Sequence, residues 1–96
     1  MTREDFLKTL NDTSPPSLPP ELLTLWYDGR GNWEQAHSIA QDIPGADGSR
    51  LHAYLHRKEG DQFNAGYWYK RSGTAMPHIS LHEEWHLLVQ YFLDKQ

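Results

Sequence analysis

Apolar and polar residues recur along this chain with the spacing of helices, not with the alternation of half-buried strands. The segment 51–58 shows this most clearly, because its apolar positions follow i, i+3, i+4, i+7 spacing: Leu51, Tyr54, Leu55 and the stem of Lys58. No segment keeps up the period-two alternation that a strand requires. The pattern therefore predicts an all-α protein of about six short helices.

Capping residues and helix breakers set the expected bounds of these helices. The expected segments are Thr2 to about Asn11, Pro20 to the Gly29–Gly31 corner, Asn32 to about Gln41, a start at Asp47 or Ser49 running to Gly60, Asp61 to about Ser72, and Ser80 onward. Residues 12–20 are rich in proline, which cannot continue a helix, so we expect a stiff connector there. Residues 43–48 are dense in Pro and Gly and are expected to form a loop.

Length and composition predict one globular domain over residues 1–96. A chain of 96 residues suffices for a single core, and its 38% hydrophobic and 12% aromatic content is typical of folded proteins. The absence of Cys excludes disulfides and thiolate metal sites, so a reducing compartment, the cytoplasm, is the expected location. The N-terminus has no continuous apolar run, and we expect no membrane span.

Net charge argues against nucleic acid as a partner. Thirteen acidic and nine basic residues give a net charge of −4, which opposes attraction to phosphate backbones. Because the chain has no Cys, any metal site must use imidazole and carboxylate ligands, and six His are available.

Two successive helix-turn-helix hairpins share one plan. Leu22, Gly31 and Ala36 of the first correspond, at a constant offset, to Leu51, Gly60 and Ala65 of the second. The second hairpin continues through the segment 61–73, DQFNAGYWYKRSG, which is similar to the second helix of Sel1-like repeats, relatives of tetratricopeptide repeats. That resemblance implies an interaction scaffold.

A longer pattern runs over residues 33–73. The strings WEQAHSIAQD and HAYLHRKEGDQFNAGYWYKRSG resemble a family of small bacterial proteins. The resemblance implies a compact bacterial protein and carries no assigned reaction.

One helix is expected to carry a row of potential metal ligands. His52, His56 and Glu59 follow i, i+4, i+7 spacing, so they project from adjacent turns. Such a row could hold zinc or another divalent metal if His37 of the preceding helix faced it. The alternative is that these residues flank the apolar stripe and bond to the neighbouring helix.

The segment 82–86, HEEWH, matches the H-E-x-x-H pattern of zinc hydrolases, so His82 and His86 form a second candidate pair. Against that interpretation, Glu83 sits where a capping box with Ser80 requires it. Glu84 brings a charge to a position that is normally uncharged, and no third ligand is evident downstream.

Polar and aromatic residues near the second hairpin corner complete the candidates. Arg57 could bind an anionic ligand in a pocket with Trp68 and Tyr69, or it could pair with Glu59 or Asp61 and fasten the corner. The four Trp fall on apolar stripes and are read mainly as core. Consecutive aromatic residues at 67–69 cannot all face one core, so at least one should be exposed or lie in an interface, and Tyr67 and Tyr69 are the candidates.

These observations favour a non-catalytic module that binds a protein or a small polar ligand. The expected binding surface comprises His37, His52, His56, Arg57, Glu59, Tyr67 and Tyr69. The alternative is a zinc-binding protein or metal-dependent hydrolase that uses His52 and His56, or His82 and His86. A homodimer is left open, and no cofactor other than zinc is indicated.

Overall fold

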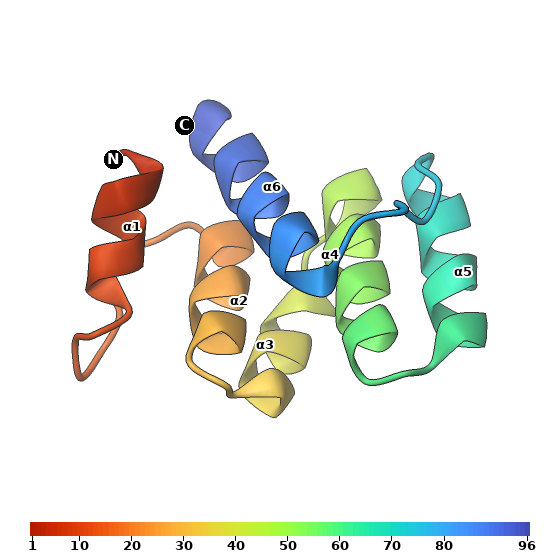
Figure 1. Ribbon diagram of the computed structural model, residues 1–96, viewed down its shortest axis with the longest axis horizontal. Helices are drawn as coiled ribbons and strands as arrows, with labels where there is room; N and C mark the ends of the chain where they lie inside the picture. The colour runs from red at the N-terminus through yellow and green to blue at the C-terminus, as the bar shows by residue number, and fades with distance from the viewer.

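The structure is a computed structural model that describes residues 1–96 as six α-helices with no β-strand (Figure 1). The helices are α1 (Arg3–Thr9), α2 (Pro20–Gly29), α3 (Trp33–Ala40), α4 (Gly45–Lys58), α5 (Gln62–Ser72) and α6 (Leu81–Asp94). The predicted all-α class is confirmed. The longest helices have 14 residues, and none has both the length and the apolar content that crossing a membrane requires.

Side-chain caps begin four of the six helices. The capping residues are the expected ones: Thr2, Asn32, Asp61 and Ser80. At α6 the Ser80 hydroxyl accepts the Glu83 N–H at 3.0 Å, and the Glu83 carboxylate accepts the Ser80 N–H at 3.2 Å. This reciprocal bonding is the predicted capping box, and it commits Glu83 to a structural task.

Helix α4 begins earlier than the sequence indicated. It starts at Gly45, which has a φ of 80°, and neither Asp47 nor Ser49 caps it. Gly48 permits this early start, because an ideal Cβ there would lie 1.9 Å from the carbonyl oxygen of Ile43. The predicted loop thus ends sooner, because one glycine lets the first helical turn pass close to the preceding backbone.

The helices form two antiparallel hairpins with a helix laid across them (Figure 1). Helices α2 and α3 pack together, as do α4 and α5, and α3 packs against α4 to join the pairs. Helix α6 crosses this row and packs against α1, α2 and α4. Figure 1 shows α5 at one end of the row and α1 at the other. Kinship of the hairpins to the repeat families stays a prediction.

The main core lies between α6 and the row. Buried side chains from every helix except α5 form one cluster, and Trp85 of α6 anchors it by donating its indole N–H to the Leu25 carbonyl at 3.1 Å. Helix α5 buries Ala65 and Tyr69 in a smaller cluster with Ala53 of α4. Helix α4 thus contributes to both clusters, and polar residues project from its remaining surfaces.

Candidate functional site

Three histidines from two helices converge at the contact between α3 and α4. His37 belongs to α3, and His52 and His56 lie one turn apart on α4. One ring nitrogen from each His lies within 4.8 Å of the others. The sequence predicted the row on α4 and left open whether His37 would face it, and the structure places His37 against it.

Packing of α3 on α4 explains why His37 faces this way. The Trp33 indole N–H donates to the Leu55 carbonyl of α4 at 2.8 Å and fixes that face of α3 against α4. Trp33 and His37 are one turn apart and stack with 4.8 Å between ring centroids. The ring of His37 is therefore held beside α4 by its neighbour.

Two indoles enclose the three imidazoles. Trp68 of α5 stacks on His52 with 4.1 Å between centroids, and His52 in turn stacks on His56 at 4.8 Å. Both Trp33 and Trp68 are half-buried: Trp33 packs against the main core cluster and Trp68 against the smaller one, so they lie at the edge of the core and also at the site. The sequence placed Trp68 only in a pocket with Arg57 and Tyr69 and assigned Trp33 to no site, although the i, i+4 spacing of Trp33 and His37 was a usable signal.

The Nε2 atoms of His37 and His52 lie 2.9 Å apart and share one hydrogen bond. Two neutral imidazoles can form such a bond only when one Nε2 carries the proton and the other offers its lone pair. If the shared proton moved to an Nδ1 atom, both Nε2 atoms would present lone pairs to the same point. The pair is therefore arranged as two nitrogen ligands for an electrophile.

Burial keeps two of the three rings in the neutral form. Desolvation, reinforced by the nearby His37 and His56, lowers the pKa of His52 to about 4. Desolvation and repulsion from His56 also lower the pKa of His37, and the negative charge of Glu59 partly opposes them. Neutral imidazole is the form that coordinates metals, so both rings are ready to bind at neutral pH.

Glu59 orients the third ring. The Glu59 Oε1 atom lies 2.6 Å from Nδ1 of His56, so a proton on Nδ1 can be donated to the carboxylate. That arrangement leaves the Nε2 lone pair of His56 free, and metal-bound histidines in proteins commonly have such a carboxylate partner. Asp61 lies near the same ring, but it caps α5 by accepting the Asn64 N–H at 3.1 Å.

His37, His52 and His56, with Glu59 behind His56, fit a transition-metal site in chemistry and approximately in geometry. Zinc binds imidazole nitrogen at about 2.0–2.1 Å, so tetrahedral ligand nitrogens lie about 3.4 Å apart. The observed nitrogens lie within 4.8 Å of one another, with 2.9 Å between those of His37 and His52, so their separations bracket that spacing. Three imidazoles leave one coordination position for water or another ligand.

Arg57 and Tyr69 are not part of this surface. The Arg57 guanidinium donates to Glu84 of α6 at 2.7 Å and also to the Ile79 carbonyl. The Tyr69 hydroxyl donates to the other Glu84 oxygen at 2.6 Å, and only 2% of Tyr69 is exposed. The predicted pairing of Arg57 with Glu59 or Asp61 is wrong, and of the two candidates for exposure, Tyr69 is the buried one.

A second buried carboxylate, Asp28 of α2, is satisfied in the same way. The Tyr54 hydroxyl and the Lys58 ammonium donate to its two oxygens at 2.9 Å and 2.8 Å. Burial and the Asp28 charge raise the pKa of Tyr54, as burial and Glu84 raise that of Tyr69, so both phenols stay protonated. The two carboxylates tie α4 to α2, α5 and α6.

Tyr67 is exposed as predicted, with half of its surface accessible. Its hydroxyl accepts a hydrogen bond from Arg71 at 3.0 Å. Phe63, one turn earlier on α5, is 89% exposed. These aromatics lie on an outer face of α5.

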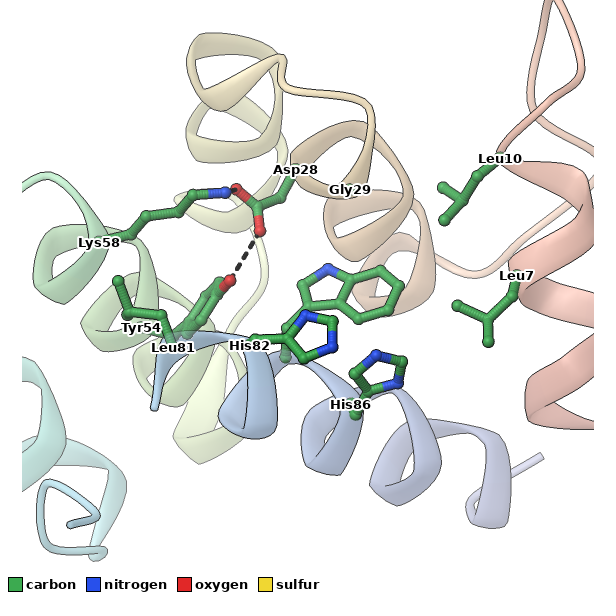
Figure 2. A pocket seen from close by; sticks show the side chains of 10 residues that line it. Leu7, Leu10, Asp28, Gly29, Tyr54, Lys58, Leu81, His82 and His86 are labelled. Atoms are coloured by element: carbon green, nitrogen blue, oxygen red, sulfur yellow. Dashed lines mark hydrogen bonds and ion pairs between the residues drawn. The ribbon is translucent and has the colours of Figure 1, made fainter. Parts of the chain in front are cut away.

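His82 and His86 lie on α6, apart from the three-histidine site. Their ring centroids are 4.4 Å apart, and both rings line a cavity shown in Figure 2. Neither glutamate of the HEEWH segment is free to act as a base, because Glu83 caps α6 and Glu84 is bonded to Arg57 and Tyr69. No third His or acidic side chain lies close enough to His82 and His86 to share a metal ion with them.

Comparison with known protein families, curated proteins and solved structures found no match to this chain. The functional interpretation therefore rests on the residues and their geometry.

Proposed function

We propose that this protein binds one divalent transition-metal ion, with zinc as the best-fitting ion, through His37, His52 and His56. The observation that carries the proposal is the convergence of three imidazoles from α3 and α4 on one point. The sequence predicted a non-catalytic binding module, with a metal-binding protein as the alternative. The geometry favours the metal-binding alternative.

The ligand set narrows the class of metal. Imidazole nitrogen suits zinc, copper, nickel and iron, whereas calcium and magnesium prefer oxygen ligands. No thiolate is available, because the chain has no Cys. We expect Mg²⁺ and Ca²⁺ to bind far more weakly than Zn²⁺.

The proposal is for metal binding without an assigned reaction. A zinc hydrolase needs a group that takes a proton from metal-bound water, and Glu59 is already bonded to His56. Asp61 is likewise committed to capping α5. We place the function in the cytoplasm as part of the same proposal, since a chain without Cys gains no disulfide in an oxidising compartment.

Isothermal titration calorimetry with Zn²⁺ on untagged protein tests the proposal. We expect one equivalent to bind, and we expect His37→Gln and His52→Gln each to weaken binding at least a hundredfold. The matched control is the double variant His82→Gln/His86→Gln, which removes two histidines with the same i, i+4 spacing from α6. Affinity that survives the α3 and α4 substitutions but falls in the α6 double variant would contradict the proposal.

The exposed aromatics of α5 favour a second function, association of two copies of the chain. The end helices of stacked helical hairpins normally present a polar outer face, whereas α5 presents Phe63 and Tyr67. A symmetric dimer through this face would cover both residues. Sedimentation velocity should then show a dimer that Phe63→Ser dissociates, and a wild-type monomer at high concentration would exclude this function.

A further inference from the structure

A cavity of about 420 Å³ lies where four helices meet, away from the three-histidine site (Figure 2). Leu7 of α1 and Leu10, which follows that helix, form one wall, and His82 and His86 of α6 lie opposite them. The Asp28–Lys58 pair lies at one end. Small-molecule sites in proteins span about 300–1,000 Å³ and combine apolar walls with a few placed polar groups, as this cavity does.

The apolar part of the cavity is shaped by close packing of Trp85 against α2. An ideal Cβ at Gly29 would lie 2.9 Å from Cζ2 of Trp85 and 3.2 Å from Cδ2 of Leu10. Because Gly29 has no side chain, the indole can lie against the α2 backbone and form part of the lining. Trp85 is only 7% exposed, so the part of its indole that lines the cavity adds to the apolar walls that the leucines form.

The polar end has unused donors and no unused carboxylate oxygen. Both oxygens of Asp28 already accept hydrogen bonds, one from Lys58 and one from Tyr54. The Lys58 ammonium has three N–H groups and uses one of them on Asp28, so two are left for a ligand.

The imidazoles of His82 and His86 also line the cavity and add polar groups to its wall. No protein group forms a hydrogen bond with the ring nitrogens of His82 or His86, so each ring has an N–H group to donate to a ligand. The polar end of the cavity therefore suits a ligand group that accepts several hydrogen bonds, and a carboxylate does so.

We propose that this cavity binds a small monocarboxylate with an apolar body. The body would lie against Leu7, Leu10 and the exposed edge of Trp85, and the carboxylate would accept hydrogen bonds from Lys58. This proposal is independent of metal binding, because no residue of the three-histidine site lines the cavity.

The test uses 3-phenylpropionate as the probe and 3-phenylpropanol as its uncharged match. Titration of the ¹⁵N-labelled, metal-free protein should move the indole signal of Trp85, and the carboxylate should bind at least tenfold more tightly than the alcohol. Equal affinity of the two probes, no binding of either, or signal changes confined to the surroundings of His37 and His52 would overturn the proposal.

A variant pair locates the charge that is recognised. Lys58→Gln should weaken 3-phenylpropionate binding at least tenfold and leave 3-phenylpropanol nearly unaffected, whereas Lys70→Gln on α5 should change neither. Unchanged carboxylate affinity in folded Lys58→Gln would contradict the assignment. The comparison of the two probes on wild-type protein needs no variant, so it decides the matter even if Lys58→Gln fails to fold.

Discussion

Helix α4 carries polar side chains on two sides, and the two sides differ in how far their hydrogen-bonding capacity is used. On one side Arg57, Tyr54 and Lys58 meet buried carboxylates of α6 and α2. On the other side His52 and His56 meet His37, where one ring nitrogen of each lies within 4.8 Å of the others and His37 shares a hydrogen bond with His52.

This difference separates the polar cluster that stabilises the fold from the cluster that can bind a metal ion. In the carboxylate network every buried side-chain oxygen and nitrogen has a partner. A network of that kind is costly to break, because removal of one member leaves a buried charge unpaired. The histidine cluster instead brings three imidazole nitrogens together at one point. A metal ion could use all three as ligands, so this cluster gains most from an added ion.

The largest expected effect comes from removing the guanidinium of Arg57. Arg57→Ala leaves the buried Glu84 carboxylate without its charge partner and should lower the free energy of unfolding by about 3–5 kcal/mol. Urea denaturation measures this change, and Arg71→Ala on exposed α5 should change stability by about 0.5 kcal/mol or less. A loss below about 1 kcal/mol for Arg57→Ala would show that the network does not stabilise the fold.

Removal of a single hydroxyl should give a smaller effect on the same side of α4. Tyr69→Phe deletes a hydrogen bond to the Glu84 carboxylate and should cost about 1.5–3 kcal/mol. Tyr67→Phe, two residues away on the same helix, deletes only an exposed contact to Arg71 and should cost about 0.5 kcal/mol or less. Equal costs in denaturation experiments would remove the distinction between the buried and exposed phenols.

Substitution of Glu59 should affect metal binding and leave folding nearly unchanged. Glu59→Gln weakens the acceptor that orients His56, and loss of such partners typically reduces metal affinity about 10–100-fold. We expect about tenfold weaker Zn²⁺ binding, because the amide oxygen still accepts a hydrogen bond. Calorimetry and thermal denaturation together check this, and a variant that binds zinc normally would show that Glu59 does not position the ring.

The smallest effect is a pH dependence of the metal-free protein. His52 has a pKa of about 4 in the folded chain and an ordinary value of 6.5, so the unfolded state binds more protons between these pH values. The free energy of unfolding therefore decreases as the pH falls through that window. Because His52 is only half-buried, the decrease should stay below about 1 kcal/mol.

The variant His52→Gln isolates this contribution. In the presence of a chelator, its urea midpoint should fall less than that of the wild type between about pH 7 and pH 4.5. At pH 7 its stability should be within about 1 kcal/mol of wild type, because the histidine cluster contributes little to the fold without a metal. Identical pH responses of the two proteins would contradict a lowered pKa of His52.

Local sequence patterns predicted most of the helices and part of the candidate site. Helical periodicity and caps predicted the helices, and the i, i+4, i+7 spacing placed His52, His56 and Glu59 on one side of α4. Glu83 likewise formed its capping box with Ser80, since both residues belong to one helical turn.

The residues whose contacts the sequence did not predict are held by partners far along the chain. Arg57 and Glu59 are near in sequence but project from different sides of the helix, so Arg57 pairs with Glu84, 27 residues away. Tyr69 is buried because it faces α4 beside Ala53 and Ala65, and its hydroxyl reaches Glu84, 15 residues away. The approach of His37 likewise required the Trp33 contact to Leu55, a feature of tertiary packing.

The most direct test of the central claim is a crystal structure of the zinc-soaked protein with anomalous data collected at the zinc edge. The account predicts one strong anomalous peak about 2.0–2.1 Å from a ring nitrogen of each of His37, His52 and His56. An anomalous peak at His82 and His86 with none among the three α3 and α4 histidines, or no peak at all, would contradict it.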